Sequence, residues 1–262
     1  MNPTLVNGMG SNQSIYQSKT APDQNPGTKG LALDGRVWYY TWNQTAAALT
    51  LGEIQVTATV TPNHHDQTVT AAADFSAGAT IVTLTVGATA IALEEYTDGW
   101  VFISDGTGQG LYYKIRDHAG NAGSTTSLAT LYDPVVTTTG AASTMSLVRN
   151  KWANPQQSNT TVSEIPVGIG QVTLAAATTA ATDTALAVDP TYGWLQTWGP
   201  CPVLCDEAVT AEGQAITIGT GVVGAAEADD TATTVSQEFI IGYNLTPLVD
   251  TEFQLVDLRI CA

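Results

Sequence analysis

Apolar and polar residues alternate along most of this chain from residue 36 onwards. In the segment 54–60 the apolar side chains fall on every second position, which is the period of a half-buried β-strand. The segment 37–42 is dense in aromatic residues and favours a strand as well. Further strands of a first β domain are predicted at 82–86, 100–104, 111–116, 127–132 and 143–148.

A second series of strands is predicted at 171–175, 195–197, 215–220, 239–243 and 253–260. In the last of these, Phe253 and Leu255 share one phase while Val256, Leu258 and Ile260 take the other, a change that predicts a β-bulge. Gly87 stands at a similar change of phase and predicts a bulge or bend.

Helical patterning is absent from the sequence. No segment sustains an apolar period of about 3.6 residues, and the alanine-rich stretch 175–187 is interleaved with threonines, which favour strands. That stretch is therefore predicted to be strand or loop. The fold class predicted is all-β, with a helix content below about 10%, well under that of a typical globular protein.

Composition along the chain suggests the domain boundaries. Residues 1–34 are polar with few large apolar side chains, and are expected to form an extended N-terminal arm that becomes ordered only against another subunit. The first β domain is predicted at 35–150 and the second at 165–262, each a sandwich or barrel. The segment 151–164, which contains Pro155, is predicted to be the linker.

The charge of the chain argues against several classes of partner. It has 8 Lys and Arg against 24 Asp and Glu, a formal net charge of −16, and no Lys or Arg between Lys151 and Arg259. Nucleic acids and anionic bilayers are bound mainly through cationic side chains, so neither partner is expected. Residues 1–20 lack an apolar h-region, and the apolar run 79–93 is broken by threonines. A soluble chain without signal peptide or membrane span is predicted.

Two polar segments could suggest ligand chemistry. His64-His65-Asp66 is the only histidine cluster, but neighbouring strand residues point to opposite faces and His118 is distant in sequence, so a polar loop is favoured over a metal site. Asp105–Gly110 is rich in glycine, yet a strand pattern follows it rather than a helix, and it lacks further carboxylates at alternate positions. A β-hairpin turn is favoured there.

Three pairs of adjacent acids invite comparison with glycosidases: Glu94-Glu95, Asp206-Glu207 and Asp229-Asp230. Such an enzyme needs two carboxyl groups about 5–9.5 Å apart across a sugar cleft, which sequence adjacency does not supply, so solvated acids are favoured. Four tryptophans lie within strand patterns and are expected in the core rather than along a sugar groove: Trp38, Trp42, Trp100 and Trp194. No catalytic residue, cofactor or metal site is predicted, and the protein is not expected to be an enzyme.

The cysteines do not form a recognisable disulfide framework. Cys201 and Cys205 are four residues apart, which in an extended strand places their Cα atoms about 13 Å apart, beyond the roughly 4.4–6.8 Å that a disulfide spans. Buried small hydrophobic residues are therefore favoured. A turn that brings the two together, or a thiol partner for Cys261, is the alternative.

The segment 98–115 resembles a signature of structural proteins from marine and cyanobacterial tailed phages. The same likeness extends to Leu131–Pro134, Leu147–Asn150, Gly193–Pro200 and Thr251–Leu258, and covers most of the chain from Arg36 to Ile260. The last 65 or so residues are also similar to phage capsid decoration (cement) proteins in their order of elements.

The resemblance implies a structural virion protein on the outer surface of an icosahedral capsid, assembled in the host cytoplasm. It implies that the chain binds the major capsid protein, stabilises the shell and forms a homo-oligomer, expected to be a trimer. A head-fibre or tail component and a carbohydrate-binding module for host adhesion are the alternatives. Glycan binding requires two or three aromatic side chains exposed together beside hydrogen-bonding neighbours, whereas aromatic residues buried in the core would argue against it.

Overall fold

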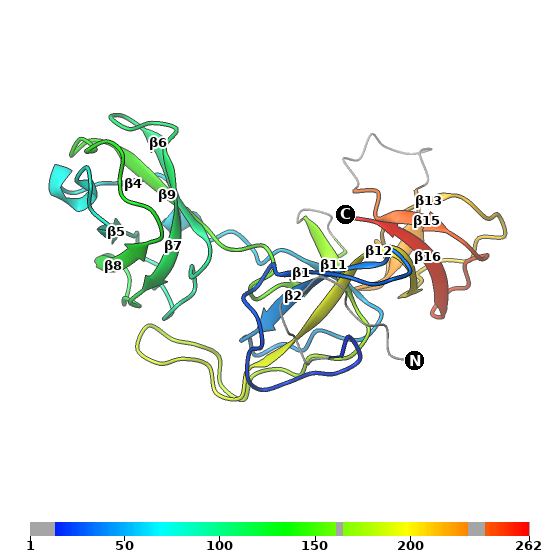
Figure 1. Ribbon diagram of the computed structural model, residues 1–262. Coiled ribbons are helices and arrows are strands. Elements are labelled where there is room, and N and C mark those ends of the chain that lie inside the picture. Colours follow the sequence, from blue (N-terminus) through cyan, green and yellow to red (C-terminus); the bar gives the residue numbers. More distant parts are fainter. Residues whose placement is uncertain (1–13, 161–164, 230–238, 262) are drawn as a thin grey trace. The chain divides into compact units, whose positions relative to one another are not determined.

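The structure, a computed structural model, describes residues 14–160, 165–229 and 239–261 (Figure 1). It is all-β, as the sequence predicts, with 40% strand and 3% helix. The helical residues belong to two short 3-10 turns, η1 (Pro62–His64) and η2 (Ala72–Phe75). The chain divides into two compact units with one sheet each, and the sheets form a half-barrel and a nearly closed barrel.

Unit 1 is formed by residues up to 58, by 151–178 and by residues from 189 onwards. Its ten-stranded sheet has the order β10-β3-β11-β12-β16-β15-β13-β14, and β1 and β2 join it through β12. The strands are β1 (Lys29–Leu31), β2 (Val37–Asn43), β3 (Ile54–Val56), β10 (Gln156–Gln157), β11 (Pro166–Gly170), β12 (Thr191–Leu204), β13 (Ala215–Ile218), β14 (Ala226–Ala228), β15 (Gly242–Asn244) and β16 (Phe253–Arg259).

Strand β12 organises unit 1, because its two halves have different partners. The half Thr191–Trp198 pairs antiparallel with β2, and the half Trp198–Leu204 pairs antiparallel with β16. Gly199 lies at the junction with a φ of 84°, in the left-handed region that favours glycine. The sequence pattern predicted only 195–197 as strand here, because the glycines and prolines of β12 interrupt the apolar alternation.

Unit 1 has two buried clusters. The larger surrounds Ile54, Val203, Ile216, Val256 and Leu258, and includes both Cys201 and Cys205. The other is aromatic and brings Trp38, Tyr40 and Trp194 together with Ile15 and Ala32.

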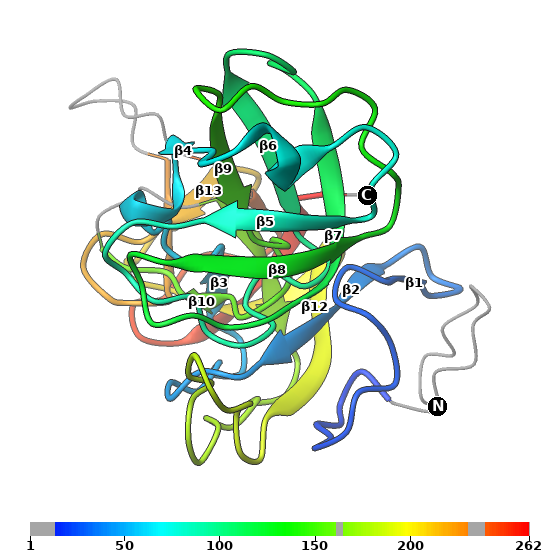
Figure 2. The same ribbon diagram turned by 90° about the vertical axis from the view of Figure 1, so that its left-hand side faces the viewer.

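Unit 2 is formed by residues 59–150 and 179–188. Its six-stranded antiparallel sheet has the order β4-β9-β6-β7-β8-β5, and β5 and β8 run side by side in Figure 2. The strands are β4 (Gln67–Thr68), β5 (Ile81–Thr85), β6 (Trp100–Asp105), β7 (Tyr112–His118), β8 (Thr126–Leu131) and β9 (Thr144–Val148). Alternate residues of these strands are buried, which confirms the period-2 interpretation of the sequence.

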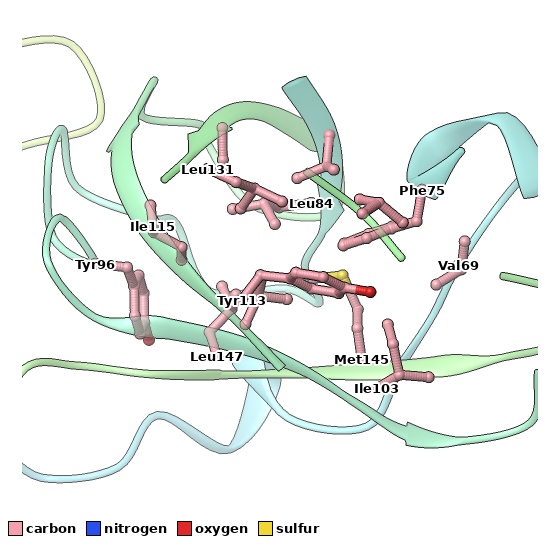
Figure 3. Packing of buried hydrophobic residues seen from close by; sticks show 14 of the residues in the cluster. Val69, Phe75, Leu84, Tyr96, Ile103, Tyr113, Ile115, Leu131, Met145 and Leu147 are labelled. Atoms are coloured by element: carbon pink, nitrogen blue, oxygen red, sulfur yellow. The ribbon is translucent and has the colours of Figure 1, made fainter. Parts of the chain in front are cut away.

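The core of unit 2 lies on one side of this sheet. Leu84, Ile103, Ile115, Leu131 and Met145 converge there from five strands (Figure 3). Phe75 of η2 and Val69 belong to the same cluster. The other side of the sheet is exposed at many positions.

The observed units correct the predicted domain boundaries. Strands β2 and β3 lie in the predicted first domain, 35–150, yet they pair with β12 and β11 of unit 1. The predicted linker 151–164 contains β10, which pairs with β3. The segment 179–188, predicted within the second domain, belongs to unit 2, where the Leu93 N–H donates to the Thr182 carbonyl at 2.7 Å. Period-2 patterns identify strands but not their partners, which is why these assignments were wrong.

The N-terminal arm predicted at 1–34 is also corrected in part. Residues 1–13 lie outside the described residues, but 14–34 pack against their own chain. Ile15 is buried in the aromatic cluster, the backbone of Lys19 pairs with that of Tyr192, and β1 pairs with β2. A single buried isoleucine and backbone pairing therefore order this polar segment without another subunit.

Several strands also differ from the sequence prediction. The strand predicted at 171–175 is observed as β11 at Pro166–Gly170, the one predicted at 239–243 begins only at Gly242, and β14 was not predicted. At Gly87 there is no bulge within a strand, because β5 ends at Thr85. Positions rich in glycine and alanine carry little apolar contrast, so the pattern cannot fix strand ends there.

Candidate functional site

The last strand, β16, has large apolar residues on both faces. The predicted bulge is wrong, since β16 pairs with β12 in an unbroken register from Phe253 opposite Leu204 to Arg259 opposite Trp198. Val256 and Leu258 point into the core, whereas Phe253 is 52% exposed and Leu255 39% exposed. Antiparallel strands with one solvated face normally place polar residues there. The two apolar phases in the sequence therefore mark two faces of one regular strand.

Neighbouring strands extend this exposed apolar surface. Because directly opposed residues of an antiparallel pair share a face, Pro202 of β12 lies beside Leu255, and Tyr243 of β15 lies beside Asp257. Leu245 follows β15, and its N–H donates to the Leu255 carbonyl at 2.8 Å. We call this surface the β16 face, and it consists of Pro200, Pro202, Leu204, Tyr243, Leu245, Phe253 and Leu255.

Charged residues of β16 lie beside the β16 face. The Arg259 guanidinium contacts the Asp257 carboxylate at 2.5 Å and lies 4.2 Å from the centre of the Trp198 ring. The seven residues of the face itself are uncharged. Asp257 lies opposite both Pro200 and Tyr243, and its ion pair with Arg259 lowers the cost of removing it from water when a complementary apolar surface binds.

A glycine shapes the edge of the β16 face. Gly52 has a φ of 72°, and a β-carbon at this position would overlap the ring of Phe253. The Gly52 carbonyl accepts a hydrogen bond from the Leu204 N–H at 2.9 Å. The absence of a side chain thus lets the Phe253 ring lie directly over the backbone next to β12.

The four tryptophans are divided between core and surface. Trp38 and Trp194 are buried, as predicted, and Trp42 is partly buried against the same cluster. Trp100 contradicts the prediction, because it lies on the outer side of the unit 2 sheet, with its ring centre 5.4 Å from that of Tyr112. Within β6 the inward positions belong to Val101 and Ile103, which places Trp100 in the outward phase.

The histidines occupy positions that sequence spacing did not suggest. His64, predicted in a polar loop, is fully buried, and its Nδ1 lies 2.6 Å from the Tyr96 hydroxyl. His118 contacts the same residue, because its Nε2 accepts a hydrogen bond from the Tyr96 backbone N–H at 2.8 Å. Burial raises the pKa of Tyr96 and lowers the pKa of His118, so both stay neutral near neutral pH.

This network is internal packing with satisfied polar groups. His65 is only partly exposed, and burial lowers its pKa as well. Among residues 14–160, 165–229 and 239–261, no group of three His, Cys, Asp or Glu side chains is placed to hold a metal ion. Sequence gave no indication that His64 and His118 share one partner, because 53 residues separate them.

The acid pairs are mostly engaged with backbone amides rather than free in solvent. One Asp206 oxygen accepts the N–H groups of Gly221 and Val222 at 2.7 and 2.9 Å, and Glu207 accepts the Ala228 N–H. Glu95 forms an ion pair with Arg149. Glu94 and Asp229 are partly exposed, and Asp230 lies outside the described residues.

The glycine-rich segment Asp105–Gly110 is the hairpin turn that the sequence predicts. It joins the antiparallel strands β6 and β7, and Gly106, Gly108 and Gly110 all have φ between 83° and 91°. The Gly110 N–H donates to the Ile103 carbonyl at 2.9 Å. The glycines therefore provide the left-handed backbone of a turn.

The cysteines Cys201 and Cys205 are buried and free, as favoured from the sequence. Burial raises the pKa of Cys201 to about 12 and that of Cys205 to about 11. Both thiols are therefore protonated and unreactive in the fold. Cys261 is also free and partly exposed.

No protein-family model, curated protein or solved structure matches the chain. Within the described parts of the chain, none of the helices has the length and apolar character needed to cross a membrane. The β16 face is the candidate site of unit 1, and the outer side of the β6–β7 hairpin is that of unit 2. The sequence pattern did not indicate the β16 face, because the second apolar phase of 253–260 predicts a bulge rather than a second apolar surface.

Proposed function

We propose that this chain is a structural virion protein that decorates an icosahedral phage capsid and binds the major capsid protein through the β16 face. The observation that carries the proposal is that β16 has large apolar residues on both faces although only one face is covered within the described chain. Monomeric soluble proteins rarely expose large continuous apolar patches, and such a patch commonly marks an interaction site. The resemblance to phage structural proteins supplies the class of partner.

An exposed apolar surface suits a protein that holds neighbouring capsid subunits together. Internal DNA pressure opens seams between capsid subunits, and a protein that spans a seam opposes this by burying area on both sides. Apolar contacts contribute roughly 25 cal/mol per Å² of apolar surface removed from water, and they need no cations, which are scarce in this chain. We also propose that the protein assembles as a homotrimer, since closed symmetry is the rule for soluble homo-oligomers.

Particles with and without the protein test the proposal. Binding to the assembled shell stabilises it by mass action, by about 2.7 kcal/mol per site at a hundredfold excess over the dissociation constant. The DNA-release temperature of decorated particles should therefore exceed that of bare particles. An unchanged release temperature at saturating protein would contradict a decorating role, and electron microscopy of labelled particles would separate the capsid from a tail or head-fibre location.

A matched pair of variants tests the surface itself. The double variant Phe253→Ser with Leu255→Ser should bind capsids more weakly, because it removes the two exposed apolar side chains of β16. Leu128→Ser is the control, since Leu128 is an exposed strand leucine of unit 2. Equal capsid binding by the double variant and the control would refute docking through the β16 face.

A further inference from the structure

The outer side of the unit 2 sheet carries three exposed aromatic side chains. Trp100 of β6 is 38% exposed, Tyr112 of β7 is 66% exposed, and Tyr132, just after β8, is 47% exposed. The rings of Trp100 and Tyr112 meet at an interplanar angle of 62° with their centres 5.4 Å apart. Phe102 lies opposite Tyr112 in the register, on the same side of the sheet, and is partly buried.

A fixed polar group lies in the middle of these aromatics. Lys114 is directly opposite Trp100 in the β6–β7 register. Its ammonium nitrogen is 3.0 Å from Oδ1 of Asp98 and 4.9 Å from the centre of the Tyr132 ring. The Tyr132 hydroxyl donates to the same Asp98 oxygen at 3.1 Å. Asp98 thus holds both Lys114 and Tyr132 in place.

Asp98 is itself held in an unusual conformation. It is 3% exposed and has a φ of 60°, in the left-handed region that non-glycine residues seldom adopt. Its N–H donates to the Ile115 carbonyl at 2.9 Å. A buried carboxylate in a strained backbone that fixes two exposed side chains is the kind of arrangement found at binding sites.

We propose that this surface, formed by Trp100, Tyr112, Lys114 and Tyr132, binds a neutral oligosaccharide. The faces of pyranose rings present C–H groups that pack against the negative face of an aromatic ring. Sugar hydroxyls accept hydrogen bonds from an ammonium group, and they can both donate hydrogen bonds to a phenol hydroxyl and accept them from it. The exposed tryptophan and tyrosine provide the apolar contact, and Lys114 provides an oriented donor beside it.

The negative charge of unit 2 favours a neutral oligosaccharide over other ligands that stack on aromatic side chains. Single-stranded nucleic acids also stack on such rings but need a cationic groove along their backbone. Unit 2 contains three Lys and Arg against nine Asp and Glu, and Lys114 is already paired with Asp98. The field of the unit therefore opposes polyanions and leaves uncharged polysaccharide as the ligand class. The site is separate from the β16 face, so it does not depend on the proposed capsid binding.

Calorimetric titration of the full chain with cellohexaose, and separately with maltohexaose, tests the proposal. The β-1,4-linked glucose units of cellohexaose present flat faces to an aromatic surface, so this probe is expected to bind and to bind more tightly than maltohexaose. Trp100→Ala and Tyr112→Ala should each weaken the affinity about tenfold or more, which corresponds to about 1.4 kcal/mol. Trp100→Phe should restore much of the loss.

Phe253→Ala is the matched control, because it removes an exposed aromatic side chain from unit 1. It should leave oligosaccharide binding unchanged and weaken capsid binding, whereas Trp100→Ala should do the reverse. Circular dichroism verifies that each variant is folded. The proposal would be overturned if neither hexasaccharide bound the intact chain, or if the Trp100→Ala and Phe253→Ala variants bound the sugar with equal affinity. It would also be overturned if Trp100→Ala reduced self-association of the chain and left sugar binding unchanged.

Discussion

Two leucines on one strand provide a direct test of the two faces of β16. Leu258 is fully buried in the unit 1 core, whereas Leu255, three residues earlier, is 39% exposed on the β16 face. The same substitution, Leu→Ala, can be made at both positions. Any effect of strand propensity is therefore nearly matched, and the difference between the variants reports burial.

The expected magnitudes follow from that burial. Removing a fully buried leucine side chain costs about 2–5 kcal/mol of unfolding free energy, since a cavity adds to the lost transfer energy. Leu255→Ala should cost about 1 kcal/mol, because much of its side chain already contacts water and no closed cavity forms. In a unit of this size each kcal/mol lowers Tm by about 2–4 °C, so Leu258→Ala should lower it by about 4–20 °C and Leu255→Ala by about 2–4 °C.

Thermal unfolding followed by circular dichroism measures both shifts, and co-sedimentation with capsids below the lower Tm measures binding. Leu255→Ala should weaken capsid binding although it destabilises the protein less. Leu258→Ala should bind like the parent chain as long as it is folded. A Tm loss for Leu255→Ala as large as that for Leu258→Ala would show that Leu255 is buried in the isolated protein and would refute the assignment of the faces.

Three further predictions concern single residues. Because burial lowers the pKa of His118 below its ordinary value of 6.5, the unfolded chain takes up a proton there that the folded chain does not, so the unfolding free energy should decline as the pH falls through 6.5. His118→Gln should flatten that decline in denaturant titrations. Cys201 and Cys205 should resist a thiol reagent at mildly alkaline pH until denaturant is added, and rapid reaction of both in the native protein would contradict their burial. Gly52→Ala should lower Tm by the equivalent of about 1–3 kcal/mol, because a left-handed residue gains strain and its β-carbon overlaps Phe253; an unchanged Tm would show that the ring moves freely.

The sequence predicts the elements of this fold better than it predicts their arrangement. Strands β5 and β6 are visible as period-2 patterns because each has one buried and one more exposed side, whereas β2 is visible through its aromatic residues and is buried along most of its length. The pairing of β2 with β12 joins residues about 150 positions apart, and no local pattern contains that information. Strand β12 was largely missed since Gly193, Gly199 and two prolines interrupt its alternation.

The candidate surfaces show the same limit. Both apolar phases of 253–260 are plain in the sequence, but which phase faces the core depends on the register with β12. Trp100 has the pattern of a core residue until its neighbours Val101 and Ile103 are seen to occupy the inward phase. Asp98, Lys114 and Tyr132 come together only through the pairing of β7 with β8, which places residues from three segments side by side.

The division of the chain between the two units has a consequence for the order of folding. Most of unit 2 is one uninterrupted segment, 59–150, whereas β2 and β3 of unit 1 pair with β12 and β11, which begin only after residue 165. During synthesis from the N-terminus, β12 and β11 are still missing when nearly all of unit 2 is already complete. Long-range pairing of this kind folds slowly, and domains fold as units as they emerge. Unit 2 is thus the part able to become compact first. The sheet of unit 1 can be completed only after the second half of the chain has been synthesised.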